Sequence, residues 1–325
     1  MVIVQVDHMG RLANEQRSAV LAMVKIATQA DKVAPLSEQV LLAVRDQHPE
    51  AGSESPARSV HFLANAGAHL AGYAHLEQGA DGQGCTAEIV VDPSHRRQGV
   101  GATLIHTLEQ ALEPHAETLW LWSHGDLDGA RAFALRAGYS SVRELWQMHR
   151  DLRSDTTSLP AVLLPEGFRT RHFVVGRDEE AWLRVNVRAF VDHPEQGRMT
   201  RPDLERRIAE PWFDDKGFIL IEDIRGSQPV LAASHWTKVV PAEDPKVRAT
   251  TGEVYVVGVD PAYQGMGLGR TVTVLGLAHL RQQGLTEAML YVDADNAAAV
   301  ATYRRLDFDR SGVDIMYSRI IHSPM

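Results

Sequence analysis

The sequence predicts an α/β (α+β) protein of two tandem domains, each with a mixed, mostly antiparallel sheet flanked by helices. The chain has 325 residues, which is too long for one ordinary domain and suits two of about 150 residues each. Residues 87–112 and 255–280 repeat one pattern: a strand, Asp-Pro, a short polar turn, Gly-x-Gly and a long amphipathic helix. In both copies an aromatic-rich strand, an Ala-rich helix and a closing aromatic strand follow. A matching order of four elements indicates two homologous domains.

The elements of each copy are predicted from the spacing of apolar residues and from turn signals. The helical segments expected before the central strands are 14–46, with a break at 33–39, and in the second copy 178–197 and 200–213. The expected strands are 118–126, 218–225, 230–240, 252–259 and 288–295. The resulting order is β-α-α-β-β-β-α-β-α-β, and its short hairpin connections make the central strands antiparallel. A doubly wound parallel sheet is therefore excluded.

The domain boundary is expected after the closing strand of the first copy. Residues 154–165 mix polar side chains with two prolines, which is typical of a linker. The sequence therefore predicts an N-terminal domain at 1–153, a linker at 154–165 and a C-terminal domain at 166–325.

Composition excludes several classes of protein. A net charge of −9 argues against a general nucleic-acid binder. The single cysteine, Cys85, rules out an intramolecular disulfide and a cysteine cluster for metal, and the 15 histidines show no HExxH spacing. No apolar run approaches the roughly 18 residues of a membrane span, and the N-terminus lacks the basic start of a signal peptide. We expect a cytoplasmic, monomeric, metal-free protein without nucleic-acid or membrane partners.

The glycines Gly265, Gly267 and Gly269 lie between a strand and the start of a helix. Backbone N–H groups at a helix start lack intrahelical partners, and glycine lets a phosphate approach them closely. The segment therefore predicts a diphosphate site, although a tight turn with a small-residue packing site would use the same glycines. A dinucleotide fingerprint would need glycine where Arg270 stands, and a Walker loop would need Gly-Lys-Ser/Thr. Neither NAD nor ATP is favoured.

The pattern Gln/Arg-x-x-Gly-x-Gly/Ala after a V-x-V-D-P strand end resembles the acetyl-CoA loop of the GCN5-related N-acetyltransferase (GNAT) superfamily. This resemblance implies acetyl-CoA as co-substrate, with main-chain groups of a splayed strand binding the pantetheine arm and the acyl carbonyl. The acetyl-CoA contacts it implies in the first copy are Ile89, Val90, Val91, Arg96, Arg97, Gln98, Gly99, Val100, Gly101 and Ala102. Those in the second copy are Val257, Gly258, Val259, Gln264, Gly265, Met266, Gly267, Leu268, Gly269 and Arg270.

Amide formation from a thioester needs a neutral amine and a proton for the departing thiolate. The superfamily often takes its base from the strand before the loop and its acid from a tyrosine on the late helix. The second copy has Glu253 and Tyr303 there, whereas alignment of the first copy places Cys85 and Ala134 opposite them. We therefore expect one active site, in the C-terminal domain, and an N-terminal domain that binds CoA without catalysis. Taken alone, Glu253 also fits a surface carboxylate and Tyr303 a core aromatic residue.

Several strings also resemble the mycothiol synthase family: DKVAPLSEQVL, RVNVRAFVDHPEQG, HWTKV, GEVYVVGVDPAYQGMGLG and LYVDADNAAAVATYRRLDF. This resemblance implies acetyl transfer from acetyl-CoA to the cysteinyl amine of a cysteine–glucosamine–inositol conjugate, which gives mycothiol. It implies that Glu253 acts as general base through water and that Tyr303 acts as general acid toward the CoA sulfur. The implied substrate contacts are Glu38, Glu195, Lys238, Glu253 and Tyr291. Further implied acetyl-CoA contacts are Asn296, Ala297, Ala298, Ala299, Val300 and Ala301.

Two other functions remain open from the residues alone. The acetyl-CoA half would look the same in an acetyltransferase for another amine, such as an aminoglycoside, a polyamine or a protein N-terminus. A non-catalytic acetyl-CoA sensor would also carry two ligand loops. The presence of Glu253 and Tyr303 in only one copy argues against a sensor. Lys238 and Glu195 would, without the resemblance, be read as solvated surface charges.

Overall fold

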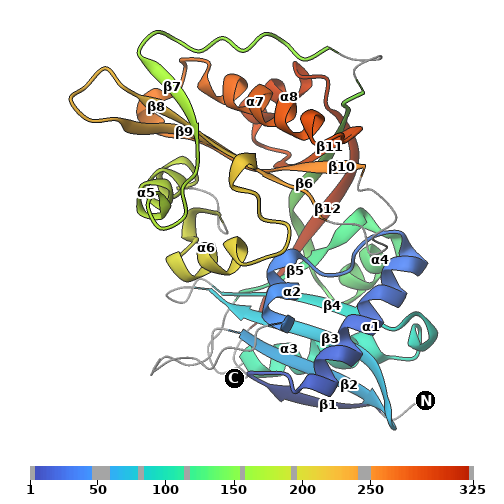
Figure 1. Cartoon of the computed structure of the whole chain (residues 1–325). Coiled ribbons are helices and arrows are strands. Elements are labelled where there is room, and N and C mark those ends of the chain that lie inside the picture. The colour runs from blue at the N-terminus through green and yellow to red at the C-terminus, as the bar shows by residue number, and fades with distance from the viewer. Residues whose placement is uncertain are drawn as a thin grey trace. The chain divides into compact units, whose positions relative to one another are not determined.

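The computed structural model describes residues 4–45, 59–79, 84–112, 118–153, 158–191, 196–240 and 250–321. The chain forms two compact units, residues 1–145 with 312–325 and residues 146–311. Figure 1 labels their helices and strands. Each copy of the repeat has the element order predicted from the sequence, and the α/β fold class with mostly antiparallel strand pairing is confirmed.

The first unit, residues 1–145 with 312–325, has helices on both faces of its sheet. Its helices are α1 (Asn14–Asp31), α2 (Glu38–Arg45), α3 (Val100–Leu112) and α4 (Asp128–Arg136). Its strands are β1 (Val4–Met9), β2 (Ser59–Ala66), β3 (His69–Gln78), β4 (Cys85–Val91), β5 (Thr118–Ser123) and part of β12 (Asp309–Ile320). They lie in the order β1-β2-β3-β4-β5-β12. The β4–β5 pair is parallel, whereas the pairs β1–β2, β2–β3, β3–β4 and β5–β12 are antiparallel.

Successive side chains of β2 pack into two different hydrophobic cores, one on each face of the first sheet. Phe62 packs with Leu104 of α3, whereas the next residue, Leu63, packs with Val20 and Met23 of α1. Successive side chains of a strand point to opposite faces of the sheet. The period-two pattern therefore places α3 and α4 on one face and α1 and α2 on the other.

The second unit, residues 146–311, repeats this arrangement. Its helices are α5 (Glu179–Ala189), α6 (Arg201–Ile208), α7 (Leu268–Gln282) and α8 (Ala297–Arg304). Its strands are β7 (Phe168–His172), β8 (Phe218–Asp223), β9 (Val230–Lys238), β10 (Thr251–Val259), β11 (Glu287–Asp293) and part of β6 (Ser140–Asp151). They lie in the order β6-β11-β10-β9-β8-β7, and β10 and β11 are parallel.

Neighbouring residues of β8 again serve different cores. Ile219 packs with Val272 of α7, and Leu220 packs with Trp182 of α5. Close approach of α7 to the sheet requires Gly276, because a Cβ atom there would lie 2.0 Å from the buried ring of His235. The face covered by α5 and α6 is called the acceptor face below, and the face covered by α7 and α8 the helix-α7 face.

Each closing strand, β6 and β12, is shared between the two compact units, which differs from the division given by the sequence repeat. Residues 312–320 of β12 belong to the first unit, where Ile315 pairs with Ser123 of β5. Residues 146–151 of β6 belong to the second unit, next to β11. The sequence repeat predicts boundaries at 1–153, 154–165 and 166–325, and these stay a prediction. The compact units are a different division, because they assign the C-terminal segment to the first unit.

Across the parts of the chain that the structure describes, no helix has the length and apolar character needed to cross a membrane. Within those same ranges, no group of three or more histidine, cysteine or acidic side chains is arranged to hold a metal ion.

Candidate active site

A one-residue bulge in β10 shapes the acceptor face. The register with β9 shifts between Val254 and Val256, so Tyr255 is the extra residue. Val254 packs on the helix-α7 face, whereas both Tyr255 and Val256 pack with Trp182 on the acceptor face. A bulge re-aims side chains in this way and often lies beside an active site. Tyr255 shares the acceptor face with Glu253, as alternate residues of a strand do, and the bulge adds Val256 to that face.

Glu253 and Lys238 form an ion pair on the acceptor face. They are direct partners in the register of β9 and β10, and Lys238 Nζ lies 3.7 Å from Glu253 Oε2. The Lys238 side chain is only 10% exposed and the Glu253 side chain 18%. The ammonium group also lies 5.2 Å from the ring centroid of Trp212 and 4.9 Å from that of Tyr255. The carboxylate is therefore held in a largely enclosed, aromatic-lined place that still reaches solvent.

Tyr255 is held in place by residues other than Glu253 and Lys238. Arg207 of α6, which is buried, donates from Nε to the Tyr255 hydroxyl over 2.8 Å and from an Nη group to the Asp203 carbonyl. The rings of Trp212 and Tyr255 meet edge to face at 5.1 Å. The sequence did not indicate Tyr255, Trp212 or Arg207 as site residues. The one signal that could have indicated Tyr255 is the length of β10, which has nine residues where β4 has seven.

The strands β10 and β11 part immediately after Glu253. Their parallel pairing runs from Thr251 to Glu253, opposite Glu287 to Met289. Residues 257–259 pair only with β9 among the described residues, as His235 to Ala233 lie opposite them. One main-chain edge of this segment therefore has no ladder partner, and such groups need a hydrogen-bond partner from solvent or a ligand. The segment predicted to bind pantetheine thus has free backbone groups.

The glycine loop follows through a short turn at Pro261–Tyr263. Asp260 Oδ1 accepts a hydrogen bond from the Ala262 amide over 2.9 Å and starts this turn. Gly265 and Gly267 have φ angles of 79° and 78°, and a Cβ atom on either would meet no atom within 4 Å. Glycine is therefore needed there for the left-handed backbone and not for packing. The loop leaves the start of α7, with its unpaired amides, open to an anion.

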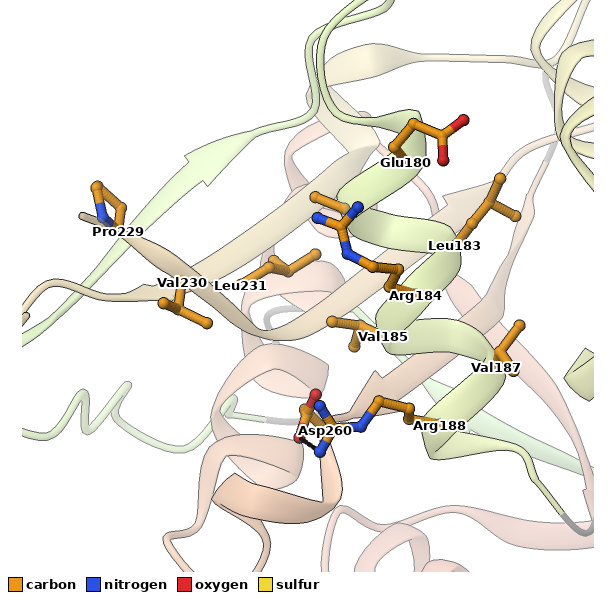
Figure 2. Close-up of a pocket in the computed structure, with 11 residues that line it drawn as sticks. Glu180, Leu183, Arg184, Val185, Val187, Arg188, Pro229, Val230, Leu231 and Asp260 are labelled. Carbon is orange, nitrogen blue, oxygen red and sulfur yellow. Dashed lines mark ion pairs between the residues drawn. The ribbon is translucent and has the colours of Figure 1, made fainter.

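A hollow of about 620 Å³ lies beside this turn, between α5 and the start of β9 (Figure 2). Arg188 on α5 forms an ion pair with Asp260 at 3.1 Å, which Figure 2 marks with a dashed line. None of the predicted substrate or acetyl-CoA residues lines the hollow. We assign the Arg188–Asp260 pair a structural part, since it ties α5 to the turn that precedes the glycine loop.

Tyr303 lies on α8 and packs against the core of the helix-α7 face, which also contains Val254. Its ring meets Phe308 edge to face at 5.8 Å. Burial raises the pKa of the Tyr303 hydroxyl to about 12, so the group keeps its proton at neutral pH. Glu253 and Tyr303 thus belong to opposite faces of the sheet in the region where β10 and β11 part. Groups on both faces can approach a ligand that enters such a split.

The remaining predicted residues are distributed as follows. Tyr291 on β11 is 40% exposed, and its hydroxyl accepts a hydrogen bond from Gln147 over 3.1 Å. Asn296 begins α8, where its side chain accepts a hydrogen bond from the Ala299 amide, and the segment 296–298 is exposed. Glu38 lies in the first turn of α2, in the first unit. Glu195 lies outside the described residues.

The first copy differs in its loop and in the counterpart of Glu253. Arg96 forms two hydrogen bonds of 2.8 and 2.7 Å with the Asp31 carboxylate, and Gly99 has a φ of 95° with open space around it. As in the second copy, the two parallel strands separate before the loop, because the pairing of β4 with β5 ends at Glu88. The backbone of residues 89–91 is accordingly free on that side among the described pairs.

The alignment of Cys85 with Glu253 is wrong. The register of β10 contains the extra residue Tyr255, whereas the described pairs of β3 and β4 show no shift. Six positions before Val259 therefore correspond to five positions before Val91, which is Thr86. Threonine is no carboxylate, so the first copy still lacks a counterpart of the base, and Cys85 is simply a buried core residue.

Comparison with known proteins gives the family. The Acetyltransferase (GNAT) family model matches residues 29–139 and 188–308. Among solved structures, the tandem GNAT protein from the clavulanic acid biosynthesis pathway has a TM-score of 0.72 at 15% identity, covering 99% of this chain and all of that chain. A GCN5-related N-acetyltransferase from Sphaerobacter thermophilus has a TM-score of 0.66 at 20% identity, covering 98% and 97%. The chain belongs to the GNAT family and is an acetyltransferase.

Curated relatives show to which group of acetyltransferases the chain belongs. The mycothiol acetyltransferase of Thermomonospora curvata is 49% identical over 307 residues, covering 94% of both chains. That of Kytococcus sedentarius is 46% identical over 307 residues, covering 94% of this chain and 95% of the relative. Within the GNAT family, the chain belongs to the mycothiol acetyltransferases, and the resemblance found in the sequence is confirmed.

Proposed function

We propose that this chain transfers acetyl from acetyl-CoA to the cysteinyl amine of the conjugate 1D-myo-inositol 2-(L-cysteinylamino)-2-deoxy-α-D-glucopyranoside, producing mycothiol and CoA. The observation that carries this proposal is the position of Glu253. It is the last β10 residue paired with β11, so an enclosed carboxylate stands beside the start of a free main-chain edge. A base and an acyl-binding strand are thereby supplied by one segment.

In the proposed reaction, the amine attacks the thioester carbonyl, the new C–N bond forms and the C–S bond breaks. Main-chain groups of Val257–Val259 bind the pantetheine arm and the acyl carbonyl, and the glycine loop 264–270 with the start of α7 binds the diphosphate. The segment Asn296–Ala301 supplies further contacts to acetyl-CoA. Glu253 accepts the proton that the amine loses, through a water molecule. Tyr303, which burial keeps protonated, donates a proton to the departing sulfur.

The acceptor contacts proposed are Glu38, Glu195, Lys238, Glu253 and Tyr291. Carboxylates suit both an incoming ammonium group and sugar hydroxyls. Lys238 already holds Glu253 in place from the neighbouring strand. We further propose that the enzyme acts as a monomer in the cytoplasm.

The N-terminal loop is proposed to bind CoA without turnover. The open turn at Gly99 supports CoA binding. The absence of turnover is supported by Thr86 and Ala134, which stand where the second copy has its base and its acid. Binding there competes with the Arg96–Asp31 ion pair, so Gly99→Val should lower CoA stoichiometry while leaving most of kcat. Loss of all activity in that folded variant would contradict a non-catalytic first copy.

The test of the function is acetylation of the cysteinyl conjugate by purified protein, beside an aminoglycoside, a polyamine and a peptide N-terminus. Preferential kcat/KM for the conjugate supports the proposal. Preference for another amine identifies an acetyltransferase of different specificity. Acetyl-CoA binding without any acetyl transfer identifies a sensor, and either result overturns the proposed reaction.

A further inference from the structure

The hollow between α5 and the start of β9 is lined mainly by apolar side chains (Figure 2). Val185 of α5 and Leu231 of β9 are buried, whereas Val187 is 42% exposed and Val230 51%, so the hollow opens to solvent. Its volume of about 620 Å³ is that of a small-molecule site, and such sites are typically apolar with a few polar groups that fix the ligand. Every described lining residue belongs to the second unit.

Arg184 on α5 supplies an uncommitted positive charge to this hollow. Its side chain extends from α5 toward the β9 side (Figure 2), and none of the ion pairs between described residues involves it. Glu180, one helical turn earlier, would be the ordinary partner of an arginine in this position. It is instead paired with Arg201 of α6 at 3.0 Å. The Arg184 guanidinium group therefore has donors available to a ligand.

Arg188, one turn further along α5, brings a second guanidinium group to the hollow. Its Nη2 lies 3.1 Å from Asp260 Oδ1, which balances its charge. A guanidinium group carries five N–H donors, so this contact leaves donors for a second acceptor. The hollow thus combines an apolar body with one unbalanced positive charge and a planar fork, which matches a ligand with an apolar part and a single carboxylate.

The Arg188–Asp260 pair also connects the hollow to the glycine loop. Asp260 is buried, and its Oδ1 accepts a hydrogen bond from the Ala262 amide over 2.9 Å at the start of the turn that leads into the loop 264–270. A group that shares Arg188 therefore acts on the residue that begins this turn.

The first unit has a corresponding connection with the charges reversed. Arg96, in the loop of that unit, makes two hydrogen bonds with Asp31, the last residue of α1. In both copies an ion pair thus joins the first helix of the unit to the segment between the central strand and the loop helix. The recurrence indicates that this connection matters for the loop and not only for local packing.

We propose that the hollow is a regulatory site for a small amphipathic carboxylate. The carboxylate group binds Arg184 and Arg188, and the apolar body lies against Val230 and Leu231. Binding draws Arg188 away from Asp260, so the turn before the glycine loop is held less firmly and acetyl-CoA binds more weakly, because less of its site is preorganised. This modulation rests on the proposed binding of acetyl-CoA at the glycine loop, whereas the carboxylate site itself does not.

The first test is isothermal titration calorimetry of the full-length protein with three probes. Octanoate has an apolar body and a carboxylate, acetate has only the carboxylate, and 1-octanol has only the apolar body. Octanoate should bind at least about tenfold more tightly than either, because only octanoate satisfies both parts of the hollow. Equally tight binding of acetate would indicate a simple anion site, and equally tight binding of 1-octanol an unspecific apolar surface. Either result would overturn the proposal.

Variants then locate the octanoate site. Arg184→Gln should weaken octanoate binding about tenfold, and Arg184→Lys should weaken it less, because lysine keeps the charge but loses the fork. Val230→Asp, at an exposed position, should weaken it as much by placing a like charge in the apolar wall. The matched control is Arg177→Gln, a 60% exposed arginine just before α5 that is not among the described lining residues, and it should have no effect. Unchanged affinity in folded Arg184→Gln or Val230→Asp would refute the site.

The second test is the Kd of acetyl-CoA at increasing octanoate concentration. A regulatory ligand should raise this Kd to a plateau of about two- to tenfold, and acetyl-CoA should weaken octanoate binding by the same factor. In Arg188→Gln, acetyl-CoA should bind weakly from the outset and octanoate should have no further effect. A rise without a plateau would place octanoate in the acetyl-CoA site, and no rise would refute the regulation. Failure of the wild-type protein to bind acetyl-CoA would refute the proposed function and leave the octanoate titrations as the test of the site.

Discussion

Replacing Tyr303 by Phe removes one hydroxyl group and should separate catalysis from packing. Among the described residues the Tyr303 hydroxyl makes no hydrogen bond, and the ring contact with Phe308 does not involve it. We expect the free energy of unfolding to change by less than about 0.5 kcal/mol. Loss of a positioned proton donor should lower kcat by roughly 10²–10³ with little change in acetyl-CoA KM. Tyr139→Phe is the control: it removes a hydroxyl bonded to Glu109 and should affect stability without affecting kcat.

The pH dependence gives a second, independent test. With a pKa of about 12, roughly one Tyr303 hydroxyl in a thousand is ionised at pH 9, so the donor stays intact across the usual assay range. Wild-type kcat should therefore show no fall attributable to Tyr303 below about pH 11. The assay is release of the CoA thiol at saturating acceptor between pH 6 and 10. A more acidic thiol leaving group should reduce the penalty of Tyr303→Phe. Equal impairment with both donors, or loss of acetyl-CoA binding, would make Tyr303 structural.

Three further predictions follow from the site and the cores. Glu253→Gln should lower kcat by roughly 10²–10⁴, with partial recovery at higher pH, and an unchanged rate near pH 7 would exclude it as base. Gly267→Val should raise acetyl-CoA KM at least about tenfold, whereas Gly284→Val, equally strained but outside the loop, should not. Burial lowers the pKa of His61 and of His75 to about 4, so unfolding takes up protons below pH 6.5. Stability should fall by roughly 3 kcal/mol per histidine by pH 4; a flat urea midpoint between pH 7 and 4.5 would contradict this.

The element order of both copies could be predicted because it rests on local periodicity. Apolar residues at helical spacing and the alternation of the strands are properties of each segment alone. The glycine loop could also be predicted from the sequence, since the left-handed backbone at Gly265 and Gly267 needs glycine.

Features that depend on pairing between distant segments were not predictable. The bulge at Tyr255 exists only relative to β9, so counting residues along the chain wrongly equated Glu253 with Cys85. The groups that surround the Glu253–Tyr255 segment come from two distant parts of the chain: Lys238 of β9 contacts Glu253, whereas Trp212 contacts Lys238 and Arg207 bonds to Tyr255. Of these, only Lys238 was indicated, by resemblance and not by spacing.

The closing strand β12 gives the protein an unusual order of completion during synthesis. Asp314 bonds to His124 across 190 residues of chain, and β12 covers the edge of β5 in the first unit. At a synthesis rate of about 5–20 residues per second, the first unit would wait roughly 10–40 s for this segment. Over that interval the edge of β5, which carries Trp120 and Trp122, has no β12 to pair with, and unpaired edges invite association with other chains. The segment 312–320 must therefore emerge from the ribosome before the first unit can finish its sheet.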